Sequence, residues 1–224
     1  MTSFAIPSYF SLLIFSAIIA VIPFLVVAAT SFAKISIVLF LVRNALGIQQ
    51  TPPGVLINTV AIVLTMFIMA PVLREIYAIL TDPGQSYETI QDLEEVFELS
   101  VAPLKAFLEM HSRPEAKEFF VDTTTQLWAA NGSTPGITAT PDDLAILLPA
   151  FLVSELTRAF EIGFLLYLPF LVIDFVVSVI IVAMGMSMLS PTVISTPLKL
   201  LLFVFIDGWS RLLQGLVLSY VPGG

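Results

Sequence analysis

The residues best able to do chemistry in this chain are ionisable groups set inside long apolar segments. Glu155, Arg158 and Glu161 follow one another at three-residue steps, and Asp207 and Arg211 are spaced i, i+4. At these spacings, side chains share one face of a helix and can pair along it. Because an ionised group facing lipid is costly, we expect these side chains to face protein or water.

Asp174 and Lys199 add two further charges to the apolar segments of the second half. The residue types leave two interpretations open. The charges can neutralise one another and hold helices or subunits together, or they can line an aqueous lumen. We expect a set of buried charges and subunit contacts, formed by Glu155, Arg158, Glu161, Asp174, Lys199, Asp207 and Arg211.

Catalytic chemistry has little support in the sequence. The only histidine, His111, lies outside the apolar segments, and the chain has no cysteine. Asp174 and Asp207 sit in consecutive apolar segments, as a pair of intramembrane protease carboxylates would. However, no glycine stands two residues before Asp207, so the sequence context of such enzymes is missing. We expect no enzyme activity, no metal and no cofactor.

Met184, Met186 and Met188 alternate with Gly185 and Ser187. Methionine often fills irregular gaps in apolar cores, which is the simpler interpretation. A flexible apolar constriction is the alternative, because apolar pore linings can exclude water by dewetting. Met184, Met186 and Met188 would then form a pore gasket, and Gly185 and Pro191 would act as hinges of the loop that carries them.

The composition requires an apolar environment around these residues. Of 224 residues, 58% are hydrophobic and 12% are charged, whereas soluble globular chains average about 45–50% apolar and about 25% charged residues. One water-soluble core cannot hold this excess, so a soluble enzyme is excluded. The net charge of −8 also gives no support to a nucleic-acid surface.

The charge distribution divides the chain into three parts. Residues 81–148 carry twelve acidic and three basic residues, and the rest of the chain carries five acidic and six basic residues. We predict a hydrophobic hairpin over 1–80, an acidic helical insert over 81–148 and a second hydrophobic hairpin over 149–224. The expected fold is all-α and membrane-type, with two long kinked hairpins and at least four hydrophobic helices.

Local signals place the ends of these helices. The uncharged run 7–33 exceeds the roughly 20 apolar residues that span a bilayer, and no basic residue precedes it, so we expect a retained helix and not a cleaved signal peptide. Arg43 and Gly47 predict a helix end between them. Thr51-Pro52-Pro53 predicts an N-cap followed by proline in the first helical turn.

The acidic insert has helical patterning of its own. Apolar residues at three- and four-residue steps from Ile90 to Leu108 predict an amphipathic helix, bent near Pro103. Residues 112–115 can cap a second helix, and 131–140 has the composition of a turn-rich linker. Residues 140–143 have the form of a capping box that opens the next apolar helix. We expect the acidic side chains to form a solvated face.

Several segments resemble the FliP/SctR family, the export-gate proteins of flagellar and virulence type III secretion. The first hairpin contributes residues 31–39, 41–53 and 69–71, and the second contributes 154–164, 168–174, 184–186, 197–203 and 207–209. The insert matches little beyond its position and length. Ser195-Thr196-Pro197 favours the virulence SctR branch over flagellar FliP.

The resemblance implies a structural pore component of an export gate. Family members form a homo-oligomeric ring, pentameric in the family, with SctS/FliQ-type and SctT/FliR-type subunits and further export-apparatus membrane proteins. Unfolded secreted proteins pass through the channel. The family's methionine-rich loop forms a gasket at the pore, and it corresponds to Met184, Met186 and Met188 in this sequence, where Ser187 interrupts the run.

Basic residues near the two helix connections predict the orientation. Lys34, Arg43 and Lys199 should face the cytoplasm by the positive-inside rule, which places the insert and both termini on the periplasmic side of a bacterial inner membrane. The resemblance implies that much of the assembled complex also lies on that side. The alternative function is a small-solute channel or transporter that uses the buried charges, and an intramembrane aspartyl protease is less favoured.

Overall fold

Eight helices account for the regular structure of the part of the chain that the computed structural model describes, residues 8–48, 51–85, 89–130, 140–186 and 188–221. This all-helical architecture confirms the predicted fold class. The helices are α1 (Ser8–Ala29), α2 (Phe32–Ala45), α3 (Gly54–Leu80), α4 (Ile90–His111), α5 (Pro114–Ala130), α6 (Leu144–Ala183), α7 (Pro191–Phe205) and α8 (Gly208–Leu218).

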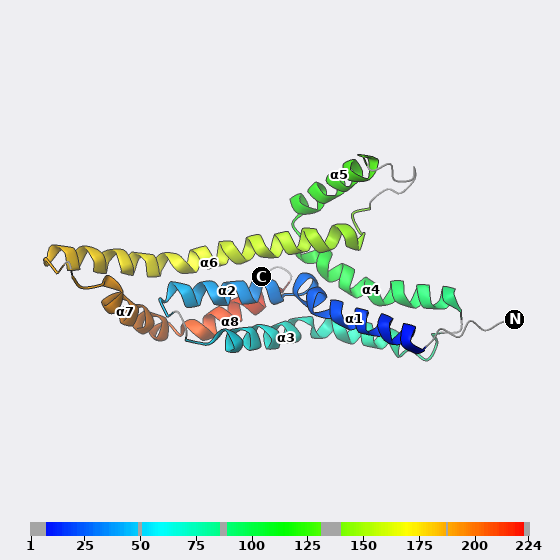
Figure 1. Cartoon of the computed structure of the whole chain (residues 1–224), viewed down its shortest axis with the longest axis horizontal. Coiled ribbons are helices and arrows are strands. Elements are labelled where there is room, and N and C mark those ends of the chain that lie inside the picture. Colours follow the sequence, from blue (N-terminus) through cyan, green and yellow to red (C-terminus); the bar gives the residue numbers. More distant parts are fainter. Residues whose placement is uncertain (1–7, 49–50, 86–88, 131–139, 187, 222–224) are drawn as a thin grey trace.

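The molecule is elongated, and the long helix α6 runs along its length (Figure 1). Helix α2 lies along α6, α3 packs against α2, and α7 folds back from the far end of α6. Helix α5 contacts α6 and projects from its side. The turn between α6 and α7 therefore forms one extreme end of the molecule, while α1 and α4 reach toward the other end.

Two helices, α3 and α6, are long and apolar enough to cross a membrane by themselves. Two further spans are possible if each bent pair counts as one, because α1 meets α2 at 66° and α7 meets α8 at 62°. The number rises to four on that basis, among the residues described. The sequence predicted the apolar run 7–33 as a separate helix, whereas α1 ends at Ala29 and turns directly into α2.

The main core is built around α2, whose buried face meets α3, α6, α7 and α8. Ile35, Val38 and Leu39 are at most 1% exposed and pack with residues of all four neighbouring helices. Gly163 on α6 allows the close approach of α2, since a Cβ at this position would overlap the side chain of Leu41. Helix α2 is thus the inner helix of the molecule, and the helices that carry the charged residues pack around it.

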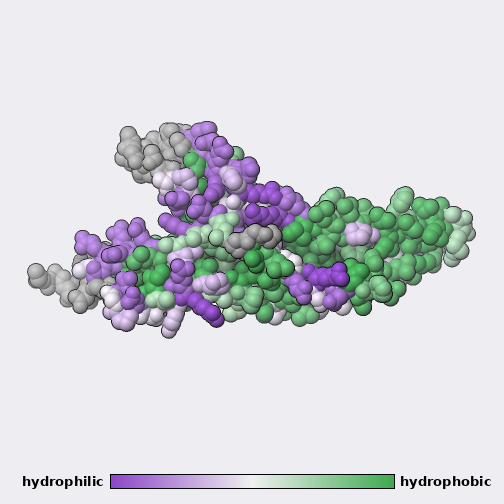
Figure 2. Space-filling view, turned by 180° about the vertical axis from the view of Figure 1, so that it is seen from behind, coloured by the Kyte–Doolittle hydropathy of each residue, from purple (hydrophilic) through white to green (hydrophobic). Residues whose placement is uncertain are grey.

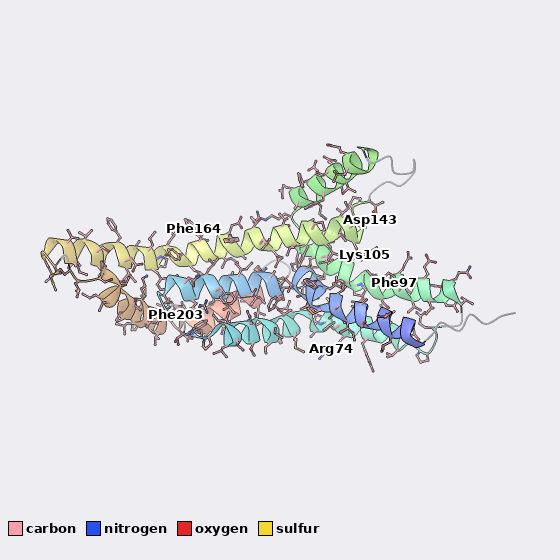
Figure 3. The ribbon with its side chains drawn as sticks, in the orientation of Figure 1. Arg74, Phe97, Lys105, Asp143, Phe164 and Phe203 are labelled. Carbon is pink, nitrogen blue, oxygen red and sulfur yellow. The ribbon has the colours of Figure 1, made fainter. Side chains whose placement is uncertain are left out.

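A second cluster joins the insert to the hairpins. Phe107 and Leu108 of α4 pack against Leu147 and Phe151 of α6 and against Tyr220 near the C-terminus. The apolar stripe predicted on α4 is buried only in this C-terminal half. Farther toward the N-terminus of α4, Leu93 and Phe97 are exposed. Figure 3 labels Phe97 on this part of α4.

The predicted start of α3 is wrong in its details. Pro53, not Thr51, is the N-cap, with φ −58° and ψ 147°, and the Thr51-Pro52 peptide is cis. A residue that precedes proline is driven out of the helical region, so Pro52 cannot begin the helix and α3 starts at Gly54. The predicted end of α2 is confirmed, because the helix stops at Ala45 and Gly47 has φ 75°.

The remaining predicted helix ends fall close to the observed ones. Helix α5 begins at Pro114, inside the predicted capping segment. Helix α6 begins at Leu144, four residues after Thr140, because Asp143 is its N-cap; the carboxylate of Asp143 accepts the backbone N–H of Thr140 at 2.7 Å. The sequence did not reveal the capping box that Thr89 and Asp92 form at the start of α4. The predicted linker lies mainly in 131–139, outside the described residues.

Candidate functional site

Glu155 lies at the centre of a buried polar cluster between α2, α6 and the C-terminal segment. Lys34 Nζ is 3.3 Å from Glu155 Oε2, and the hydroxyl of Tyr220 donates a hydrogen bond to the same carboxylate. The Lys34 ammonium also sits 3.5 Å from the centroid of the Tyr220 ring. Since Lys34 is 1% exposed and Glu155 0%, each charge depends on the other for its compensation.

Arg158 extends this cluster to the insert. Its Nη1 lies 3.2 Å from Glu155 Oε1 and donates to the backbone carbonyl of His111 at 2.7 Å. The His111 ring packs against Tyr220, with ring centroids 4.9 Å apart. Burial lowers the pKa of His111 and raises the pKa of Tyr220, so both side chains stay neutral near pH 7. The cluster therefore binds α2, α4, α6 and the C-terminus together.

Glu161 does not join its neighbours on α6. It pairs instead with Arg113, at 2.6 Å, where both side chains remain partly accessible to solvent. The backbone N–H of Arg113 donates to the hydroxyl of Ser154 at 2.8 Å. The joint between α4 and α5 is thus fixed to α6 at two points, and Glu161 contributes to the attachment of the insert.

Asp174 and Lys199 form a second internal ion pair, between α6 and α7. Lys199 Nζ is 2.5 Å from Asp174 Oδ2 and donates to the carbonyl of Ala45 at 3.0 Å. Lys199 therefore also satisfies a carbonyl at the C-terminal end of α2, where a cation is favourable. The pair borders a polar cavity of about 430 Å³ that Asn44, Tyr167 and Thr192 also line.

Asp207 and Arg211 are exposed on the bend between α7 and α8. Among the ion pairs of the described residues, none joins these two side chains. Asp207 has φ 55°, in the left-handed region, and its carboxylate accepts from the Ser210 hydroxyl at 3.0 Å. Asp174 and Asp207 thus bind different partners, which is not the arrangement of a shared carboxylate dyad.

The three methionines stand in the turn between α6 and α7, at the extreme end of the molecule in Figure 1. Met184, Met186 and Met188 are 67%, 43% and 101% exposed. Gly185 has φ 73°, which ends α6, and Pro191 is the first residue of α7. The methionines therefore do not fill gaps in this chain's own core. Ser187 lies outside the described residues.

The surface around this end is apolar. Figure 2 shows hydrophobic residues gathered over the half of the molecule that ends in the α6–α7 turn, and hydrophilic residues over the half that carries the insert. Within the described ranges, no group of three or more histidine, aspartate or glutamate residues is placed to hold a metal ion.

Comparison with known proteins places these features in a family. The sequence model of the FliP family matches residues 15–216. The chain is 50% identical over 97% of its length to a probable translocation protein of Sinorhizobium fredii, of which the match covers 97%. It is 48% identical to the Yop proteins translocation protein R of Yersinia pestis, over 96% of this chain and 98% of that one. The surface presentation of antigens protein SpaP of Salmonella typhi is 40% identical, over 96% of each chain.

Proposed function

Since this chain belongs to the FliP family, we propose that it is a structural pore component of a type III secretion export gate. Its relatives carry the names of translocation and secretion proteins, and its helices are apolar enough for a membrane location. Copies of the chain form a ring with SctS/FliQ-type and SctT/FliR-type subunits, and unfolded proteins pass through it. The chain has no catalytic step of its own in this function.

The observation that carries the proposal is the exposure of the methionine turn. An exposed apolar turn at the tip of a helical hairpin does not stabilise the isolated chain, because apolar side chains are stabilised when they leave water. Brought together around a symmetry axis, Met184, Met186 and Met188 cover one another and close the lumen. Methionine side chains are unbranched and adaptable, so a passing polypeptide can displace them and they can close again.

The apolar surface supports assembly with other subunits. Phe164, Phe175 and Val182 are each exposed by 64% or more, on the part of α6 that leads to the α6–α7 turn. Asp207 and Arg211 lack an ion-pair partner within the described part of this chain. A neighbouring subunit that supplies opposite charges would satisfy them in the assembled gate, as a subunit contact requires.

The buried charges favour this function over a small-solute transporter. Glu155 and Arg158 are committed to Lys34, Tyr220 and the His111 carbonyl. A transporter would need these groups to release their partners when solute binds. Their role in a gate is structural, because they hold the helices that carry the methionine turn.

Conductance tests the gasket directly. Replacing Met184, Met186 and Met188 together by alanine should raise ion leakage through the closed, assembled gate, because the smaller side chains leave the lumen open to water. Val193 is similarly exposed, at 63%, and Val193→Ala on the same hairpin is the control. Unchanged conductance in an assembled triple variant would overturn the gasket.

Disulfide crosslinking tests whether the turn lies at a symmetry axis. The chain has no cysteine, so Met186→Cys introduces a single thiol. A disulfide requires Cα atoms within about 7 Å, and oxidation of the assembled gate should therefore yield crosslinked dimers. Phe175→Cys, at an exposed position on α6 away from the turn, is the variant for comparison. Dimers from Phe175→Cys without dimers from Met186→Cys would remove the turn from the axis.

A further inference from the structure

An apolar groove lies between α2, α3, α7 and α8 and is lined by residues of all four helices. Its volume is about 450 Å³, within the range of roughly 300–1,000 Å³ that is typical of small-molecule sites. Leu39 of α2 and the C-cap residue Leu46 form its floor, and Leu56, Leu200 and Leu213 are among its walls. Such a lining accepts a hydrocarbon chain and offers little to a polar ligand.

A cation stands at the rim of this groove. Arg43 follows Leu39 by four residues and precedes Leu46 by three, so it lies on the same face of α2 as the groove floor. Its Nη1 donates to the carbonyl of Pro52, a lining residue, at 3.4 Å. Among the described residues, no carboxylate pairs with Arg43. The guanidinium packs over the ring of Phe40, 4.9 Å from its centroid, and its charge has no anionic partner among the described residues.

Trp209 adds an amphipathic side chain to the groove lining. It lines the groove, stacks edge-on against Phe203 with centroids 5.3 Å apart, and is 38% exposed. Tryptophan is enriched where membrane hydrocarbon meets headgroups. An apolar groove with tryptophan in its lining and an arginine bonded to one of its lining residues matches the chemistry of a phospholipid, which has apolar acyl chains at one end and an anionic phosphate at the other.

We propose that this groove binds an anionic phospholipid of the membrane, with one acyl chain between α2, α3, α7 and α8 and the phosphate beside Arg43. Charge complementarity selects this occupant over an uncharged one. The cytoplasmic leaflet, which Arg43 faces in the predicted orientation, carries anionic lipids that basic pockets between helices bind. The proposal rests on the membrane location in the proposed function and is independent of the pore.

Native mass spectrometry of the full chain in detergent tests the site. Phosphatidylglycerol and phosphatidylcholine with identical acyl chains are the probes. Phosphatidylglycerol should bind more tightly, and Arg43→Gln should weaken it about fivefold, the effect expected for one basic residue near a lipid headgroup. Arg74→Gln is the control, because Arg74 is an exposed cation farther along α3, away from Phe203 of the groove (Figure 3).

A steric pair tests the acyl-chain position. Leu56→Trp fills the groove and should abolish binding of both lipids, while Val55→Trp, one residue away and 80% exposed outside the groove lining, should leave it unchanged. Thermal unfolding of each variant confirms folding. Equal binding of phosphatidylglycerol by Leu56→Trp and Val55→Trp, or by Arg43→Gln and Arg74→Gln, would overturn the proposal.

Photocrosslinking in cells separates a lipid from a protein occupant. A benzophenone side chain at Val204, a groove-lining residue that is 73% exposed, should form an adduct of phospholipid mass in the assembled gate. An adduct to a polypeptide at this position would overturn the lipid site in favour of a subunit contact. The methionine variants report on the pore by conductance. If the lipid-binding tests fail, the proposed pore function is unaffected; if the conductance test fails, the lipid site is unaffected.

Discussion

At the scale of single residues, Glu155 has more charged and hydrogen-bonding partners than Lys34 does. It receives contacts from Lys34, Arg158 and Tyr220, whereas the only carboxylate beside Lys34 is Glu155, among the ion pairs described. This asymmetry has an energetic consequence, because a buried charge that loses its partner is far more costly than one that keeps another. The two halves of one ion pair therefore differ in importance.

We predict that Glu155→Leu destabilises the protein more than Lys34→Met. The first change leaves the Lys34 ammonium buried without a carboxylate and should cost about 3–5 kcal/mol, while the second leaves Glu155 bonded to Arg158 and Tyr220. Thermal unfolding in detergent measures both. Glu161→Leu is the control, because Glu161 belongs to an accessible ion pair that contributes about 1 kcal/mol or less. The reverse order for the two buried residues would contradict this account.

His111 should make stability depend on pH. Burial lowers its pKa below the ordinary value of 6.5, so the unfolded chain binds a proton before the folded one does as pH falls. The contribution of His111 to the free energy of unfolding is therefore full above about pH 6.5 and declines below it. The thermal unfolding midpoint, measured between about pH 5 and pH 8, should decrease toward acidic pH. His111→Phe, which cannot titrate, should not show that decrease. An unchanged decline in the variant would assign it to the carboxylates.

The sequence identified which residues carry charge into apolar segments, but not which residues they meet. Spacing along α6 suggested that Glu161 pairs with Arg158, yet Glu161 pairs with Arg113, 48 positions away. Contacts of that kind depend on how the insert folds back onto α6, which helical periodicity does not contain. The Lys34–Glu155–Tyr220 cluster, drawn from three distant segments, was missed for the same reason.

At the scale of helices, the most demanding contact is between α2 and α6. We predict that Gly163→Ala destabilises the protein by about 1–3 kcal/mol, as overpacking of a core does, since the added Cβ would also lie 3.2 Å from Leu41 Cβ. Gly215→Ala on α8 is the control, because nothing lies within 4 Å of its added Cβ. Leu41→Ala should partly rescue Gly163→Ala in thermal unfolding, and an absence of rescue would place the strain elsewhere.

The bend between α7 and α8 depends on Asp207, whose φ of 55° is costly for most side chains. We predict that Asp207→Val destabilises the chain by about 1–2 kcal/mol, while Asp207→Asn, which tolerates this conformation, folds normally. The Asn variant removes the charge alone, so its assembly, followed by size-exclusion chromatography with partner subunits, reports on the proposed subunit contact. Equal stability of the Val and Asn variants would show that the backbone conformation is unimportant.

Helix ends were predictable where a local signal decides them and not where tertiary packing does. Gly47 and the segment before Pro114 mark helix ends by their own conformational preferences, and the structure confirms both. The bends of 66° and 62° were not predicted as such, because only one or two polar residues, Thr30-Ser31 and Asp207, interrupt the apolar runs there. Neither the sequence of α1–α2 nor that of α7–α8 distinguishes one bent span from two separate helices.

At the scale of the whole molecule, charge and hydropathy are separated along one long axis. The acidic insert and the apolar half lie toward different ends in Figure 2. A molecule of this kind has one favourable placement in a membrane, with the charged half in water. The basic residues at the helix connections then decide which side that water is on.

We predict that, without its partner subunits, the chain inserts with the insert outside and the α2–α3 connection in the cytoplasm. Because the chain lacks cysteine, single thiols at two exposed positions, Glu98→Cys on α4 and Asn44→Cys on α2, can be compared with a membrane-impermeant maleimide. Glu98→Cys should react in cells with a permeable outer membrane, and Asn44→Cys only after the inner membrane is opened. Reaction in the opposite order would reverse the orientation, and it would move the Arg43 lipid site to the outer leaflet.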